Sequence, residues 1–317
     1  MPRNNNLKPV TFPMEVCFGQ KPETEFKNNL DAIKVKILHA PKWEDVRRYL
    51  VDFTEATWSP QPGVFDNLSD EEIDEIVLNL FIGKGLPTAL ETVDIVFLLE
   101  GISHQEVTHI VRYRNATFSA DCSGDKWWHK KAALVPNSIE NSDEFYERYK
   151  KINEDIKQLY VDMIDSKQVP LMDARYILPR CLETYYYVKM NLRDCVNLIK
   201  HRIDTNIQPE TDNVIAYRLY VELLKLYPVL AKAINIHEPS RYYATMARTG
   251  KSTNWYQPDS NNDTFDWNEE DFIYGCTRDQ LNGTNDLTYS KFNKIVREVD
   301  QQIIDILEEK RGASEKP

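Results

Sequence analysis

The chain has 317 residues, of which 42% are hydrophobic, and a formal net charge of −11, so it can bury a sizeable core. The negative charge argues against binding to a nucleic-acid polymer, which needs a basic face. The apolar runs are too short to span a membrane and the first residues lack a signal-peptide pattern, so we expect a cytoplasmic protein without a membrane partner.

The first hundred residues alternate between strand and helix patterns. Residues 1–30 are polar and are interpreted as an N-terminal arm. Residues 32–38 alternate apolar and basic side chains, which predicts a half-buried strand, and residues 43–53 predict a helix. Ser69 to Glu72 is a capping box for a helix that runs to about Phe81 and ends at Gly83. A second strand is predicted over residues 93–99.

Thr88 and Glu91 form a Thr-x-x-Glu pair just before this second strand. The same spacing satisfies a second capping box, in which both side chains would only stabilise the start of a helix. A ligand-binding role for the pair is the other interpretation. The sequence by itself leaves the two open.

A dense run of cationic, hydroxyl and small residues covers residues 109–126, and a short helix predicted over residues 104–111 leads into it. Arg112 and Arg114 cannot both be buried without anionic partners, and the hydroxyl groups of Thr117, Ser119 and Ser123 lie close to them in sequence. An anionic ligand would satisfy the whole segment. The tryptophans at 127 and 128 follow it, either to stack on a ligand or to pack in the protein.

A long amphipathic helix is predicted over residues 143–167. Its apolar residues recur every three or four positions, which predicts one face buried in the core. These residues are Phe145, Tyr149, Ile152, Ile156, Leu159 and Met163.

A second polar constellation starts at Arg175 and continues along a helix that begins near residue 190. Arg193 and Asn197 are one turn apart and share a helix face. A solvated basic face would explain arginines here, but it would not require asparagines at 191 and 197, because asparagine is only a middling helix former. These amides therefore indicate a binding role.

The C-terminal part contains a long helix predicted over residues 210–234 and then about eighty residues that end in an amphipathic helix. An acidic stretch at residues 259–270 has oxygen ligands at some positions of a calcium loop, but Thr264 stands where the loop glycine belongs. The five cysteines show no metal-site spacing. We therefore expect an acidic surface loop, reduced thiols and no bound metal.

The two polar constellations together resemble the flavin-dependent thymidylate synthases. The first resembles the Arg-His-Arg signature of that family, with Tyr113 in place of the histidine, and the second resembles its Ala-Arg-x-x-Leu-Pro and Asn-x-Arg segments. The resemblance implies an α+β fold with a central mixed or antiparallel sheet packed by long helices. It divides the chain into an arm (1–30), a synthase-like domain (31–236) and a helical C-terminal extension (237–317).

The resemblance also implies a reaction and an assembly. A one-carbon unit would pass from methylenetetrahydrofolate to C5 of dUMP, giving dTMP, with FAD as cofactor and NADPH as the second co-substrate. The active sites would be shared between subunits of a homotetramer.

The resemblance also implies site residues, at the positions of this sequence that match the motifs of the family. Those implied at the nucleotide are His109, Arg112, Ser123, Gly124, Lys126, Arg175 and Arg202, with Ser123 and Arg202 as the catalytic pair. Those implied at the flavin are Thr88, Glu91, Arg114, Asn191, Arg193, Asn197 and Asn206.

Departures from the family pattern keep other functions open. His109 stands where the resemblance would give a glutamine near the nucleotide, and Ala120 deletes a carboxylate. These changes allow hydroxymethylation of dUMP or dCMP with the same one-carbon donor, or a catalytically inactive homologue that serves as a binding module. The divergence would fit a viral member of the family, whose compartment would be the host cytoplasm.

Overall fold

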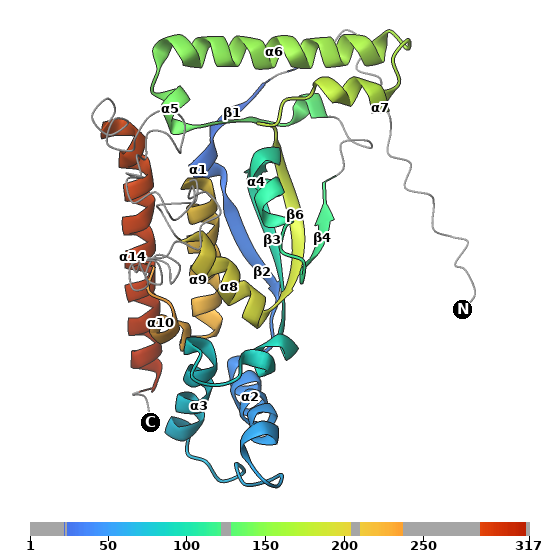
Figure 1. Ribbon diagram of the computed structural model, residues 1–317. Helices are drawn as coiled ribbons and strands as arrows, with labels where there is room; N and C mark the ends of the chain where they lie inside the picture. Colours follow the sequence, from blue (N-terminus) through green and yellow to red (C-terminus); the bar gives the residue numbers. More distant parts are fainter. Residues whose placement is uncertain (1–21, 23, 122–127, 204–209, 237–285, 315–317) are drawn as a thin grey trace, which may run out of the picture.

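The computed structural model describes residues 22, 24–121, 128–203, 210–236 and 286–314. Its centre is an antiparallel sheet in the order β2-β3-β6-β4, and a smaller sheet pairs β1 with β5 in parallel (Figure 1). The strands are β1 Phe26–Asn28, β2 Lys34–His39, β3 Asp94–Ser103, β4 Thr117–Ala120, β5 Ala133–Val135 and β6 Glu183–Asn191. The predicted α+β class with mixed sheets is confirmed.

The helices α8 (Leu192–Arg202) and α9 (Glu210–Leu226) pack on one face of the central sheet. The alternation of buried and more exposed residues along β3 shows which face this is, because Ile95, Phe97 and Leu99 are fully buried. The longer helices are α2 Trp43–Trp58, α3 Asp70–Ile82, α6 Asp143–Asp165, α8 Leu192–Arg202, α9 Glu210–Leu226 and α14 Asp286–Ser314. The shorter ones are α1 Asn29–Ala32, η1 Pro87–Thr92, α4 His104–Ile110, η2 Trp128–Lys130, α5 Asn137–Glu140, α7 Leu171–Ala174, η3 Arg175–Ile177 and α10 Leu230–Ala233.

Local signals in the sequence set the bounds of α3. The Ser69 side chain accepts from the backbone N–H of Glu72, whose carboxylate accepts from the backbone N–H of Ser69. Gly83 ends the helix in the left-handed region at φ 78°. The predicted capping box is therefore confirmed.

The C-terminal helix α14 is part of the main core. Phe292, Ile295 and Val299 are buried in the same apolar cluster as the sheet and α9, and Figure 1 shows α14 running alongside α9. The buried face is the one that the apolar periodicity predicted. The boundaries proposed at residues 30 and 236 remain predictions. None of the described helices is long and apolar enough to cross a membrane.

A second, smaller core lies beneath α6. Trp128 is buried there against Tyr160 and Leu182. Of the two roles considered for the tryptophans, Trp128 therefore packs in the protein, whereas Trp127 lies outside the described residues.

The prediction that α6 turns its apolar stripe toward the core is wrong for half of the stripe, although Met163 packs against the smaller core and Tyr149 and Ile156 are partly buried. Phe145, Ile152 and Leu159, spaced seven residues apart, are 57%, 55% and 51% exposed. The side of α6 that faces the protein carries Asn153 and Lys157, both buried. The periodicity identified a shared face correctly but could not tell what covers it.

Lys157 gives folding stability a pH dependence that can be measured. Its ammonium is buried and donates to the backbone carbonyl of Lys131, and burial lowers its pKa from 10.5 to about 8. Between these values the unfolded chain binds more protons than the folded one. The free energy of unfolding should therefore gain up to about 1.4 kcal/mol per pH unit as pH rises through this window.

The variant Lys157→Met cannot titrate and should lack this gain. Urea unfolding of both proteins at several pH values between about 8 and 10.5 measures the difference in slope. Lys151→Met, on the exposed side of α6, should keep the slope of the parent protein. Equal slopes for the parent and Lys157→Met would contradict the prediction.

Candidate active site

The helix α4 connects the central sheet to the first polar segment. A bulge at Gly101, with φ 69°, shifts the register of β3 before its end. Ser103 then caps α4 in a second capping box with Glu106, whose carboxylate accepts from the backbone N–H of Ser103. The last turn of α4 carries His109, and the exposed Arg112 and Arg114 follow the helix.

Arg202, at the end of α8, is held against His109 and a buried carboxylate. Its Nη1 donates to Oδ2 of Asp212 at 2.8 Å, and its Nη2 donates to the backbone oxygen of His109 at 3.1 Å. Oδ2 of Asp212 also lies 3.2 Å from Nδ1 of His109. The side chain of Asp212 is 1% exposed, so this carboxylate contacts the guanidinium and the imidazole and not the solvent.

A second contact joins the same two segments. The hydroxyl of Tyr113 lies 3.0 Å from Nδ1 of His201, next to Arg202. Burial raises the pKa of Tyr113 to about 12 and lowers the pKa of His201, so the phenol is the donor and the neutral imidazole is the acceptor. The residue that stands in place of the signature histidine is thus itself paired with a histidine.

These two contacts bring together constellations that lie some ninety residues apart in the sequence. Arg112 and Arg114 follow directly from the end of α4, and Arg202 is fixed at that same end. Since the chain is acidic overall, the arginines create a local positive field that the net charge does not reveal.

Most of the described residues implied at the flavin lie in η1 or in the first turns of α8, whereas Arg114 follows α4. Glu91 forms an ion pair with Arg193, which lies one turn before Asn197. The side-chain oxygen of Asn191 accepts from the backbone N–H of Asp194 and caps α8. Asn191 therefore has a structural role that its sequence position did not reveal.

Thr88 is exposed in η1 and caps nothing. The residue before η1 is Leu86, which makes no side-chain cap, so the capping-box interpretation of the Thr88 and Glu91 spacing is wrong. The binding role of the pair stays a prediction. Guanidinium, amide and hydroxyl donors of this kind would suit the carbonyl and phosphate oxygens of a flavin dinucleotide.

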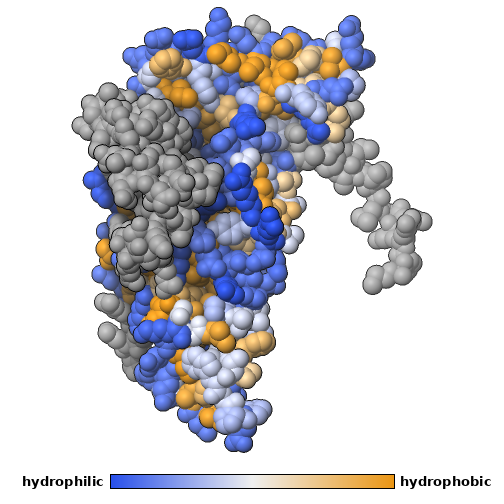
Figure 2. Space-filling model, viewed as in Figure 1, coloured by the Kyte–Doolittle hydropathy of each residue, from blue (hydrophilic) through white to orange (hydrophobic). Residues whose placement is uncertain are grey.

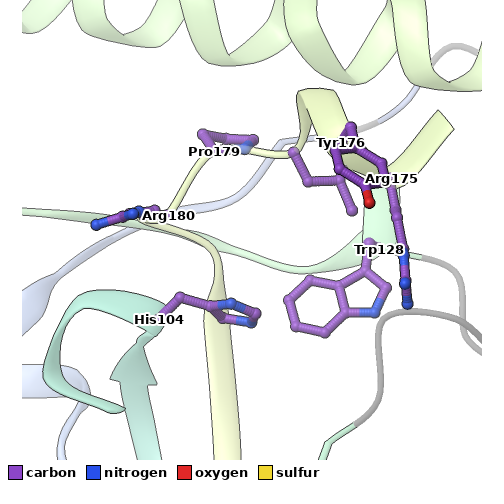
Figure 3. Close-up of a pocket in the computed structure, with 7 residues that line it drawn as sticks. His104, Trp128, Arg175, Tyr176, Pro179 and Arg180 are labelled. Carbon is purple, nitrogen blue, oxygen red and sulfur yellow. The ribbon is translucent and has the colours of Figure 1, made fainter. Parts of the chain in front are cut away.

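Arg175 lies at the other end of α4, beside a pocket of about 200 Å³ (Figure 3). His104 and Trp128 line it with their rings edge to face, 4.9 Å between centroids, and Arg175 extends alongside the indole. Burial lowers the pKa of His104. Along α4, the five-residue rise from His104 to His109 is roughly 7.5 Å, so this pocket and the Arg202 contacts are neighbouring sites.

Four of the predicted site residues lie outside the described part of the chain: Ser123, Gly124, Lys126 and Asn206. Their roles, like those of the other site residues, remain predictions. Within the described ranges, no group of three or more His, Cys, Asp or Glu side chains could hold a metal ion.

The sequence analysis did not identify two residues of this site, Asp212 and His201. Asp212 is one of several acidic residues near the start of α9, and only its burial beside Arg202 distinguishes it. His201 adjoins Arg202 in the sequence, but nothing local predicts its contact with Tyr113. The one feature of the sequence that could have indicated Asp212 is its position ten residues after Arg202. Such a spacing of an acidic residue and an arginine is too common to be specific.

Comparison with known proteins identifies the family of the chain. A family model described as "Thymidylate synthase complementing protein" matches residues 43–229, more than half of the chain. The chain belongs to this family. The resemblance to flavin-dependent thymidylate synthases is thereby confirmed, and the chain is an enzyme of that methyltransferase type.

Curated relatives share low identity with this family member over most of their own length. The flavin-dependent thymidylate synthase of Pyrococcus furiosus is 28% identical over 172 residues, which cover 53% of this chain and 68% of the relative. The enzyme of the same name from Clostridium tetani is 28% identical over 222 residues, which cover 63% of this chain and 86% of the relative.

A solved structure, the UMP/dUMP methylase PolB from Streptomyces cacaoi bound with 5-Br dUMP, has a TM-score of 0.55 at 16% identity. The superposition covers 66% of this chain and 96% of the PolB chain, and it shows that the two folds are alike.

Proposed function

We propose that this protein transfers a one-carbon unit from methylenetetrahydrofolate to C5 of dUMP, giving dTMP, with FAD as cofactor and NADPH as reductant. The name of the curated relatives supports this reaction. The observation that carries the proposal for this chain is the meeting of its two polar constellations at the Arg202–His109 and Tyr113–His201 contacts. Neither contact follows from family membership alone.

The nucleotide would lie at the arginines around α4. A guanidinium is always charged and can hold a phosphate through two parallel N–H bonds, the role proposed for Arg112 and for Arg175. Ser123, Gly124 and Lys126 are proposed for the same phosphate. Arg202 is proposed beside the pyrimidine ring, where it would stabilise the negative charge that develops on the C4 carbonyl oxygen when C5 becomes nucleophilic.

FAD, when bound, supplies the reducing equivalents for the methyl group. The residues proposed to hold it are Thr88, Glu91, Arg114, Asn191, Arg193, Asn197 and Asn206. Within this set, the ion pair with Glu91 fixes the direction of Arg193, and the cap made by Asn191 fixes the first turn of α8. Among the groups that would hold the two ligands, Asn191, Arg193 and Arg202 therefore have fixed partners before any ligand binds.

The protein would form a homotetramer with shared active sites, and α6 would lie in the interface between subunits. The exposed stripe of Phe145, Ile152 and Leu159 has the seven-residue spacing of helices that pack against one another. Figure 2 shows hydrophobic residues gathered at the top of the molecule, where Figure 1 places α6. Such a stripe is unusual on a monomer, because it would face water.

The variant Ile152→Glu should therefore dissociate the assembly, since it places a charge in the middle of the stripe. Light scattering coupled to size exclusion should give a smaller mass than for the parent protein. Lys151→Glu, one position away on the polar side of α6, should leave the mass of the assembly unchanged. An unchanged mass for Ile152→Glu would exclude α6 from the interface.

The reaction itself is tested with purified protein. The protein should be yellow with bound FAD, and incubation with methylenetetrahydrofolate and dUMP should give dTMP only when NADPH is present, as measured by product mass. A product with the mass of a hydroxymethyl nucleotide, formed from dUMP or dCMP without NADPH, would replace methylation by hydroxymethylation. A protein that binds no FAD would be an inactive homologue.

A further inference from the structure

His109 and Arg202 share one buried carboxylate. Oδ2 of Asp212 accepts from Nη1 of Arg202 and lies 3.2 Å from Nδ1 of His109, and the backbone oxygen of His109 accepts from Nη2 of Arg202. Three contacts therefore fix an imidazole and a guanidinium relative to each other. A guanidinium that only had to be neutralised would not need the histidine in the same arrangement.

The carboxylate also determines which nitrogen of His109 carries the proton. Because a carboxylate accepts hydrogen bonds, Nδ1 is protonated, and in the neutral ring the lone pair is on Nε2. The side chain of His109 is 29% exposed, and with Nδ1 occupied by Asp212, Nε2 is the nitrogen left for a ligand. An imidazole oriented in this way is a general base.

A base beside a guanidinium suits the removal of a proton from a carbon next to a carbonyl group. The base takes the proton, and the cation polarises the carbonyl group and makes the neighbouring C–H bond more acidic. In a pyrimidine nucleotide, C5 is the carbon next to C4 and its oxygen or amine. We infer that His109 is the acceptor of the C5 proton and that Asp212 is its positioning residue; this inference rests on the proposed function.

The step balances without a further reagent. Once the one-carbon unit of the folate has bonded to C5, that carbon carries both the new substituent and its original hydrogen, and N1 carries a positive charge. The C5–H bond breaks, its electron pair restores the C5–C6 double bond and neutralises N1, and the proton moves to Nε2 of His109. The imidazolium formed is paired with the carboxylate of Asp212.

The test follows tritium released to water from [5-³H]dUMP or [5-³H]dCMP by the full-length enzyme loaded with FAD, with methylenetetrahydrofolate present. His109→Gln keeps a donor for Asp212, so it should fold, and should release tritium at least about 100-fold more slowly. Its Kd for the nucleotide, from calorimetry, should stay within about threefold of the parent value. His39→Gln, the same change at an exposed position on β2, should have no effect.

Chemical rescue separates proton transfer from a structural role. His109→Ala should be as slow as His109→Gln, and free imidazole should restore its rate by at least about tenfold. Asp212→Asn also weakens the hold on Arg202, so it should slow release and weaken nucleotide binding. Imidazole should not rescue it, because its own imidazole is still present.

Three outcomes would overturn the inference. Tritium release by His109→Gln at the parent rate would overturn it and leave the proposed function standing. Slow release with equally weakened nucleotide binding and no response to imidazole would assign His109 to binding alone. A parent protein that binds FAD but releases tritium from neither nucleotide would overturn the proposed function together with the inference.

Discussion

Replacing Arg202 by alanine is expected to abolish turnover and to lower the free energy of unfolding by about 3 to 5 kcal/mol. The stability loss arises because the carboxylate of Asp212, 1% exposed, would keep its charge and lose the guanidinium that lies 2.8 Å away. The loss of turnover arises because Arg202 is the cation proposed beside the pyrimidine ring. Urea unfolding and product mass measure the two effects separately.

A double variant separates the effect on stability from the effect on activity. Arg202→Met with Asp212→Asn removes both buried charges, so it should recover most of the stability and still be inactive. Arg148→Ala, which breaks an exposed ion pair with Glu144 on α6, should change stability by no more than about 0.5 kcal/mol. If Arg202→Ala proved as mild as Arg148→Ala, the buried pair would not support this part of the fold.

Gly101→Ala is expected to destabilise the protein by more than about 4 kcal/mol. Gly101 has φ 69°, and a Cβ atom added there would lie 1.8 Å from the backbone oxygen of Ala32. Neither the strand nor the backbone of α1 can yield easily, because Leu30 and Ile33 are buried on either side of the contact. Soluble yield and thermal unfolding measure the effect.

The same substitution at Gly312 is the matched control. Gly312 lies in α14 and a Cβ there would meet nothing within 4 Å, so Gly312→Ala should stabilise by about 0.5 to 1 kcal/mol. Because the bulge at Gly101 leads directly to the cap of α4, any soluble Gly101→Ala should also bind nucleotide more weakly. Equal stability of the two variants would show that the close approach to Ala32 is relaxed in solution.

Local chemistry made much of the fold predictable from the sequence. The capping box at Ser69 and the glycine at 83 bound α3 as expected, because a cap is satisfied by neighbours a few residues away. The period of the apolar residues located β2, β3 and α14. The spacing of arginines and asparagines along α8 was sufficient to indicate the family that the comparisons then established.

The sequence did not predict which elements of the fold cover the apolar face of each helix. The apolar stripe of α6 and that of α14 have similar periodicity, yet half of the first is exposed and the second is buried. Periodicity states which side chains share a face, but burial depends on elements that are distant in the chain. The same limit applied to Thr88, whose spacing fitted a cap that the backbone of η1 does not form.

The sequence by itself determined the helix and strand types, the family and most of the candidate site residues, because these depend on residue type and short-range spacing. Only the tertiary structure decided that Asp212 joins His109 to Arg202 and that Tyr113 contacts His201. A buried carboxylate is stable only beside cations, and which cations it meets depends on how α4, α8 and α9 pack. That packing is a property of the whole chain and of no single segment.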